Sequence, residues 1–124
     1  MFKKISEFFR VIGELKYIIP LLRYKWPELD SNSSLAHSFQ ETVLKHAEKD
    51  FLYFEDEVWT YAQTNEAANI LANKLSNEGI KHGDKVVLFM ENRPNFVISL
   101  LAINKLGAIV ALINTSLTGK PLVH

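Results

Sequence analysis

The stretch that most constrains the fold runs from residue 81 to residue 115 and reads as a strand, a helix and a second strand. Its two apolar runs, residues 85–90 and 108–113, have the length and composition of strands covered on both faces. Between them, Pro94 suits a first helical turn, and Gly107 stands where a helix commonly ends. Two parallel strands joined by one helix make a βαβ unit. Such a unit needs helices on both faces of its sheet and further strands at its edges.

A first helix is predicted before this unit, from about residue 35 to residue 48. Ser33 or Ser34 can cap it, because a serine hydroxyl accepts a hydrogen bond from the free N–H groups of the first turn. Its predicted buried stripe comprises Leu35, Phe39, Val43, Leu44 and Ala47.

A β-hairpin is predicted next, from two short β runs at residues 51–54 and 58–59. The intervening Glu55-Asp56-Glu57 could suggest a metal or acid–base site. A solvated turn is favoured, because no histidine or second acidic cluster accompanies the three carboxylates.

A second helix is predicted to start at a capping box formed by Thr60 and Gln63 and to end near Asn77, before Gly79. The side chains predicted to face inward from it are Ala67, Ala68, Leu71, Ala72 and Leu75. A further helix could begin near Thr118, with Pro121 in its first turn.

Residues 1–28 predict an amphipathic helix that could lie in the plane of a membrane. Its apolar side is formed by Ile5, Phe8, Phe9, Ile12, Leu15, Ile19 and Leu22. Pro20 should kink or end it, and the basic and aromatic residues 23–27 are of the kind found at lipid head groups. The alternative is a helix docked on protein, because Glu7 and Glu14 weaken the attraction to anionic lipid.

Composition excludes several classes of function. Fourteen basic and fourteen acidic residues cancel, so no net field attracts nucleic acid. The absence of cysteine excludes disulfides and thiolate metal sites and fits a reducing compartment. The histidines, His37, His46, His82 and His124, show no metal-ligand spacing. The sequence also contains no glycine-rich phosphate loop ending in lysine and a hydroxyl residue.

Several segments, in this order, resemble the opening of the adenylate-forming (AMP-binding) superfamily: residues 59–62, 68–75, 79–86, 91–97 and 105–108. The resemblance covers about residues 35–124. Residues 112–117 and 121–124 are most similar to the fatty acid transport protein branch, which comprises long- and very-long-chain acyl-CoA synthetases. The resemblance implies an α/β fold: a partial N-terminal subdomain with a β-hairpin, a parallel βαβ unit and covering helices, preceded by the amphipathic helix of residues 1–28.

The resemblance further implies a cytoplasmic long-chain fatty acid–CoA ligase, peripheral at a membrane surface. Such an enzyme converts ATP, fatty acid and CoA, with Mg²⁺, to acyl-CoA, AMP and pyrophosphate. The phosphate loop, the nucleotide contacts and the catalytic lysine of the family would lie beyond His124. We therefore expect the chain to be the front of a longer protein, with no catalytic, cofactor-binding or metal-binding residue of its own and no activity alone.

Two asparagines are candidates to line a substrate cleft. Asn92 and Asn114 each follow a predicted parallel strand, at the end where open α/β sheets place ligands. The favoured alternative is that each asparagine caps the backbone of its own loop.

Two other functions stay open. One is a truncated, non-catalytic product that acts as a membrane- or partner-binding module. The other is an adenylate-forming ligase for a different carboxylic acid, such as an aryl or amino acid.

Overall fold

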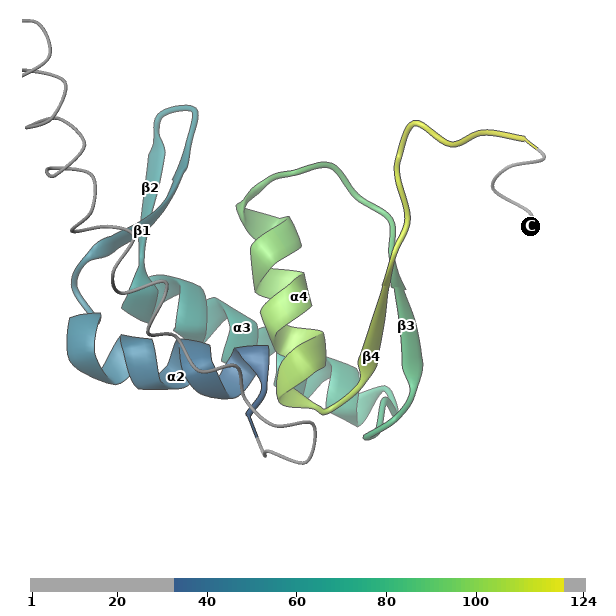
Figure 1. Ribbon diagram of the computed structural model, residues 1–124, viewed down its shortest axis with the longest axis horizontal. Helices are drawn as coiled ribbons and strands as arrows, with labels where there is room; N and C mark the ends of the chain where they lie inside the picture. Colours follow the sequence, from purple (N-terminus) through teal and green to yellow (C-terminus); the bar gives the residue numbers. More distant parts are fainter. Residues whose placement is uncertain (1–32, 120–124) are drawn as a thin grey trace, which may run out of the picture. The chain divides into compact units, whose positions relative to one another are not determined.

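Three helices and two separate two-stranded sheets make up residues 33–119, the part of the chain that this computed structural model describes (Figure 1). In chain order the elements are α2 (Leu35–His46), β1 (Asp50–Phe54), β2 (Glu57–Thr60), α3 (Tyr61–Asn77), β3 (Lys85–Leu88), α4 (Pro94–Lys105) and β4 (Ile109–Leu112). The predicted fold class is confirmed: a β-hairpin and a parallel βαβ unit are packed with helices. The amphipathic helix of residues 1–28 and the helix expected near Pro121 lie outside the described residues.

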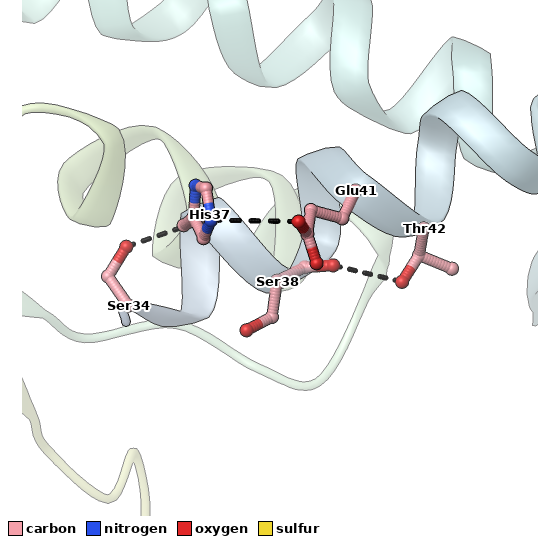
Figure 2. Close-up of polar contacts among 5 residues, drawn as sticks. All are labelled: Ser34, His37, Ser38, Glu41 and Thr42. Carbon is pink, nitrogen blue, oxygen red and sulfur yellow. Dashed lines mark hydrogen bonds and ion pairs between the residues drawn. The ribbon is translucent and has the colours of Figure 1, made fainter. Parts of the chain in front are cut away.

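Helix α2 begins at the predicted serine cap. The Ser34 hydroxyl accepts a hydrogen bond from the His37 backbone N–H at 3.1 Å, as Figure 2 shows. One turn on, the Thr42 hydroxyl donates to the Ser38 carbonyl at 2.9 Å, and His37 Nε2 lies 3.8 Å from Glu41 Oε1. Both members of the His37–Glu41 pair are exposed, so the pair contributes little to stability.

The buried stripe of α2 is narrower than the sequence pattern predicts. Phe39 and Val43 are buried as expected, together with Ala36. Leu35 and Leu44 were wrongly predicted to be buried: 51% and 79% of their surfaces are exposed. The reason is helical geometry, since Leu44 lies about 100° around the axis from Val43 and turns away from the core.

The hairpin and the capping box are confirmed. Strands β1 and β2 pair antiparallel, and Phe54 faces Glu57 next to the turn. The Thr60 hydroxyl accepts from the Gln63 N–H at 3.2 Å, and the Gln63 side chain accepts from the Thr60 N–H at 2.9 Å. Thr64, which the sequence pattern missed, is fully buried on α3, where its hydroxyl donates to the Thr60 carbonyl at 2.9 Å.

The central βαβ unit is confirmed. Strands β3 and β4 pair in parallel, and α4 connects them and lies against one side of the pair (Figure 1). Burial alternates along β3: Leu88 is buried, whereas Val87 is 63% exposed. Ile109 on β4 is 54% exposed. Within residues 33–119, α4 therefore shields only one face of these two strands, and the second covering layer that such a unit needs is not supplied by these residues.

Helix α4 is the element on which the other parts pack. It contacts α2, α3, β1, β3 and β4. Its Ile98 and Leu101 join the buried cluster that contains Phe39, Val43 and Ala68. Phe51 and Tyr61 pack against this cluster, and their rings and that of Phe39 have centroids 4.5–5.7 Å apart.

A polar junction at the end of α4 ties the three helices together. Asn104 Oδ1 accepts from the Ala36 N–H at 3.2 Å, which satisfies a free donor in the first turn of α2. Lys105 Nζ donates to Asn65 Oδ1 on α3 at 2.9 Å and to Gln40 Oε1 on α2 at 3.3 Å. The junction therefore fixes how α4 is placed against α2 and α3.

Partial burial lowers the pKa of the Lys105 ammonium group below its ordinary value of 10.5. The folded chain therefore binds fewer protons than the unfolded chain between the lowered pKa and 10.5, and stability rises with pH in that window. We expect the native chain to gain stability relative to Lys105→Met as the pH rises through the folded-state pKa. Urea unfolding at a series of pH values measures this difference.

Lys74→Met, on an exposed position of α3, is the matched control for the loss of one positive charge. A difference between the native chain and Lys105→Met that stays constant over the whole pH series would contradict the desolvation argument.

Candidate functional site

The carboxyl ends of β3 and β4 border a depression of about 500 Å³. Its walls are Met90, Glu91, Asn92 and Phe96 on one side and Leu112, Ile113, Asn114 and Thr115 on the other. The structure thus brings together Asn92 and Asn114, the two asparagines predicted to line a cleft. Whether either contacts a ligand stays a prediction.

The two asparagines differ in what their side chains do. Asn114 Oδ1 accepts a hydrogen bond from the Ser116 N–H at 2.9 Å, and the Asn114 carbonyl accepts from the Leu117 N–H at 3.1 Å. Asn114 therefore stabilises its own loop, which is the alternative role considered for it. The Asn92 side chain is exposed and makes no hydrogen bond to another residue within 33–119. Of the two, Asn92 has the free amide.

Asn114→Ala should lower the free energy of unfolding by about 0.5–1.5 kcal/mol, because it removes the acceptor for the Ser116 N–H. Asn114→Asp keeps an oxygen at that position and should recover most of the loss. Asn92→Ala is the matched control and should change stability by less than about 0.5 kcal/mol. Chemical unfolding of the three variants tests this, and equal losses for Asn92→Ala and Asn114→Ala would contradict it.

A second depression, which we call the hairpin groove, separates β1 from the start of α4. It has a volume of about 320 Å³ and is lined mainly by apolar side chains: Leu52, Tyr53, Phe54, Pro94, Phe96 and Val97. Asn92 and Arg93 complete its lining. Sequence reasoning missed this groove because it assigned these residues only to a hairpin, a turn and a helix core.

Arg93 is the cation of the hairpin groove. Its guanidinium carbon lies 5.9 Å from the centre of the Phe54 ring, within the range of a cation–π interaction. Its Nη2 lies 3.1 Å from Glu91 Oε2, and both side chains of this pair are exposed. The positive charge is therefore held at the mouth of the groove and stays accessible to solvent.

The described residues provide no cluster of metal-ligating side chains. Residues 33–119 contain no group of three or more histidine, cysteine, aspartate or glutamate side chains placed to hold a metal ion. The hairpin carboxylates are exposed, and Glu57 Oε2 accepts a hydrogen bond from Trp59 Nε1 at 3.0 Å.

No helix of the described part of the chain is long and apolar enough to span a lipid bilayer.

Comparison with known families decides what the chain is. The model of a family described as "AMP-binding enzyme" matches residues 39–124. The chain belongs to the AMP-binding enzyme family. The order of segments that suggested this superfamily is thereby confirmed, and the chain's resemblance to fatty acid transport proteins and acyl-CoA ligases is confirmed by the individual relatives.

Two curated members of the AMP-binding family illustrate this. Long-chain fatty acid transport protein 2 of Rattus norvegicus is 39% identical over 92 residues, which cover 73% of this chain and 15% of that protein. Medium/long-chain-fatty-acid–CoA ligase FadD6 of Mycobacterium tuberculosis is 34% identical over 95 residues, which cover 77% and 16%. The chain therefore spans about a sixth of the length of these relatives.

Solved structures of the AMP-binding family share the fold. The N-terminal subdomain of Klebsiella oxytoca NpsA superposes with a TM-score of 0.70 at 26% identity, covering 73% of this chain and 24% of that one. O-succinylbenzoate coenzyme A synthetase (MenE) of Bacillus subtilis, solved with AMP, gives a TM-score of 0.63 at 26% identity, covering 64% and 21%. The described residues thus have the fold of part of an adenylation-enzyme N-terminal subdomain.

Proposed function

We propose that this chain is the N-terminal part of a long-chain fatty acid–CoA ligase. The enzyme would join ATP and a fatty acid to give an acyl-adenylate and pyrophosphate, and the CoA thiol would then displace AMP. The observation that carries the proposal is the 34–39% identity to a medium/long-chain-fatty-acid–CoA ligase and a long-chain fatty acid transport protein. Both matches cover about three quarters of this chain.

In this enzyme, residues 33–119 would form part of the fold and would line depressions where substrate could bind. When bound, Mg²⁺ would screen the charge of the ATP phosphates. The described residues provide no ligand set for Mg²⁺, and no step of the reaction is assigned to them. What they provide is the segment just before α4, where Asn92 lines both adjoining depressions and Arg93 lines the hairpin groove.

The substrate class is the part of the proposal that the solved structures challenge. NpsA was solved with the aryl adenylate analogue anthranilyl-AMSN, and MenE is an O-succinylbenzoate enzyme. An aryl acid is therefore the second candidate substrate. A fatty acid is favoured because long-chain fatty acid transport protein 2 is 39% identical to this chain, against 34% for the hybrid PKS-NRPS synthetase xenE of Xenoacremonium sinensis and 26% for NpsA and MenE.

An acid panel tests the ligase proposal. The coding sequence downstream of His124 is determined, and the protein of the whole reading frame is assayed for pyrophosphate release with palmitate, octanoate, benzoate and an amino acid. Palmitate should be turned over fastest. Preference for benzoate or the amino acid would overturn the fatty acid assignment, and a stop codon directly after His124 would favour a non-catalytic binding module. The 124-residue chain alone should release no pyrophosphate above the blank.

We further propose that the protein is cytoplasmic and peripheral at a membrane, held there by residues 1–28. The support is the predicted apolar side of that segment and the basic and aromatic residues 23–27 near its end. A reporter fused to residues 1–28 should float with liposomes that contain anionic lipid. Phe8→Asp/Ile12→Asp in the same fusion should abolish flotation, and equal flotation of both fusions would refute the proposal.

A further inference from the structure

The hairpin groove and the depression at the strand ends meet at the start of α4. Asn92 and Phe96 line both of them. One is mainly apolar and the other is bordered by polar side chains, so together they present an apolar half and a polar half joined at two shared residues. Such an arrangement matches the shape of an amphiphile, a molecule with an aliphatic chain and one polar head.

The apolar half suits an aliphatic chain. Pro94 is buried, and Leu52, Phe54, Phe96 and Val97 are each only partly exposed, so a chain lying between them would exclude water from surface that the fold leaves half covered. The groove volume of about 320 Å³ lies at the lower end of the range of small-molecule sites.

The junction of the two halves suits a carboxylate, because Asn92 lines both depressions and Arg93 lines the hairpin groove next to it. The charge of Glu91 is balanced by Arg93 at 3.1 Å, and the guanidinium group has five N–H donors, so it can bind a second carboxylate without releasing the first. The free Asn92 amide and the Thr115 hydroxyl add neutral donors at the same rim.

Charge also sets the direction of such a ligand. A third hollow, of about 180 Å³, continues from the hairpin groove around Phe54 and is bordered by Glu55 and Glu57. Arg93 also lines this hollow, but Glu55 and Glu57 outnumber it, so the lining has a net negative charge that disfavours a carboxylate there. The head therefore belongs at the Asn92 end and the aliphatic tail along the hairpin.

We infer that a free long-chain fatty acid binds across these two depressions, with its carboxylate at Arg93 and Asn92 and its aliphatic chain in the hairpin groove. This inference rests on the proposed fatty acid ligase function and locates where the acid first contacts the enzyme.

Two other exposed apolar surfaces are less suited to bind a fatty acid. The hollow between β2 and α3, about 330 Å³, contains Val58 and Ile70 but also the Glu66 carboxylate. The uncovered face of the parallel sheet exposes Val87 and Ile109 and lines none of the depressions described above. Compared with these two surfaces, the hairpin groove has both a concave apolar wall and an arginine.

Photoaffinity labelling maps the site on the 124-residue chain. The probe is a palmitate analogue with a terminal diazirine, used below the concentration at which it aggregates. Labels are expected on peptides that contain Leu52–Phe54 or Phe96–Val97. Labels confined to residues 1–28, to Val87 or Ile109, or to no residue would overturn the inference. Phosphatidylcholine vesicles carrying the same diazirine chain should not label the groove, and labelling by them would identify a membrane lipid as the occupant.

Arg93→Gln tests the head contact separately from the fold, because the Arg93 side chain is exposed. The affinity of the Arg93→Gln variant for palmitate should fall about five- to tenfold relative to the native chain, since a charged hydrogen bond is lost. Affinity for hexadecanol, which has no carboxylate, should not change. Lys85→Gln is the control for loss of an exposed cation outside the groove and should leave palmitate affinity unchanged. Equal effects of Arg93→Gln on palmitate and hexadecanol would overturn the assignment of the head.

These outcomes are independent of the acid panel. If the complete enzyme prefers palmitate but the labels lie elsewhere, the ligase proposal stands and the binding site is wrong. If the complete enzyme prefers benzoate, the fatty acid assignment fails, whatever the labelling pattern.

Discussion

Replacing Leu101 with alanine should lower the free energy of unfolding by about 2–5 kcal/mol, because it deletes a buried branched side chain and leaves a cavity. Leu101 is only 2% exposed and packs in the cluster that joins α2, α3 and α4. Small domains have a total stability of about 5–15 kcal/mol, so this loss is a large share of the total. Urea unfolding followed by far-ultraviolet circular dichroism measures the loss.

The chain offers a matched control for this substitution. Leu44→Ala makes the same chemical change on a helix, but Leu44 is 79% exposed, so its cost should stay within about 0.5 kcal/mol. The sequence pattern placed Leu44 and Phe39 on one buried stripe. A large loss for Leu44→Ala would therefore support that pattern against the structure, whereas a large loss for Leu101→Ala alone supports the structure.

Gly107→Ala should be the second most damaging single change considered for this chain. Gly107 has φ = 67°, a left-handed conformation that costs an L-residue about 1–2 kcal/mol. An added Cβ would also press against the His82 imidazole, so that ring must move. The position follows α4 and precedes β4, and the Gly107 carbonyl accepts from the Gly83 N–H at 3.0 Å. The backbone strain and the His82 contact therefore both destabilise the connection between α4 and β4.

A set of variants separates the two costs of Gly107→Ala. Gly79 and Gly83 also have positive φ values, 99° and 84°, but an added Cβ at either would meet no atom within 4 Å. Gly79→Ala and Gly83→Ala should therefore show the backbone cost alone. The double variant His82→Ala/Gly107→Ala should recover the part of the loss due to the imidazole contact. If it recovers nothing relative to His82→Ala alone, the contact does not contribute.

The ends of the elements were predictable because they depend on local chemistry. The Ser34 cap, the Thr60–Gln63 capping box and the placement of Pro94 and Gly107 involve backbone groups within a few residues in the chain. Such contacts can be predicted without knowledge of any other part of the molecule. The hairpin and both parallel strands were identified for the same reason.

The candidate site was predictable only in part. Asn92 and Asn114 could be placed near each other, because the carboxyl ends of parallel strands meet at one edge of a sheet. The hairpin groove could not be predicted, since it requires Phe54 of the hairpin to lie beside Arg93 and Val97 of α4. No local signal links these residues.

The sequence by itself determined the order, type and ends of the strands and helices within residues 33–119 and the family to which the chain belongs. The tertiary structure alone decided which leucines are buried, how Lys105 joins three helices, and which face of the parallel sheet α4 covers. The physical reason is the range of the interactions: caps and turns are satisfied by neighbours along the chain, whereas burial and groove formation depend on contacts between residues far apart in sequence.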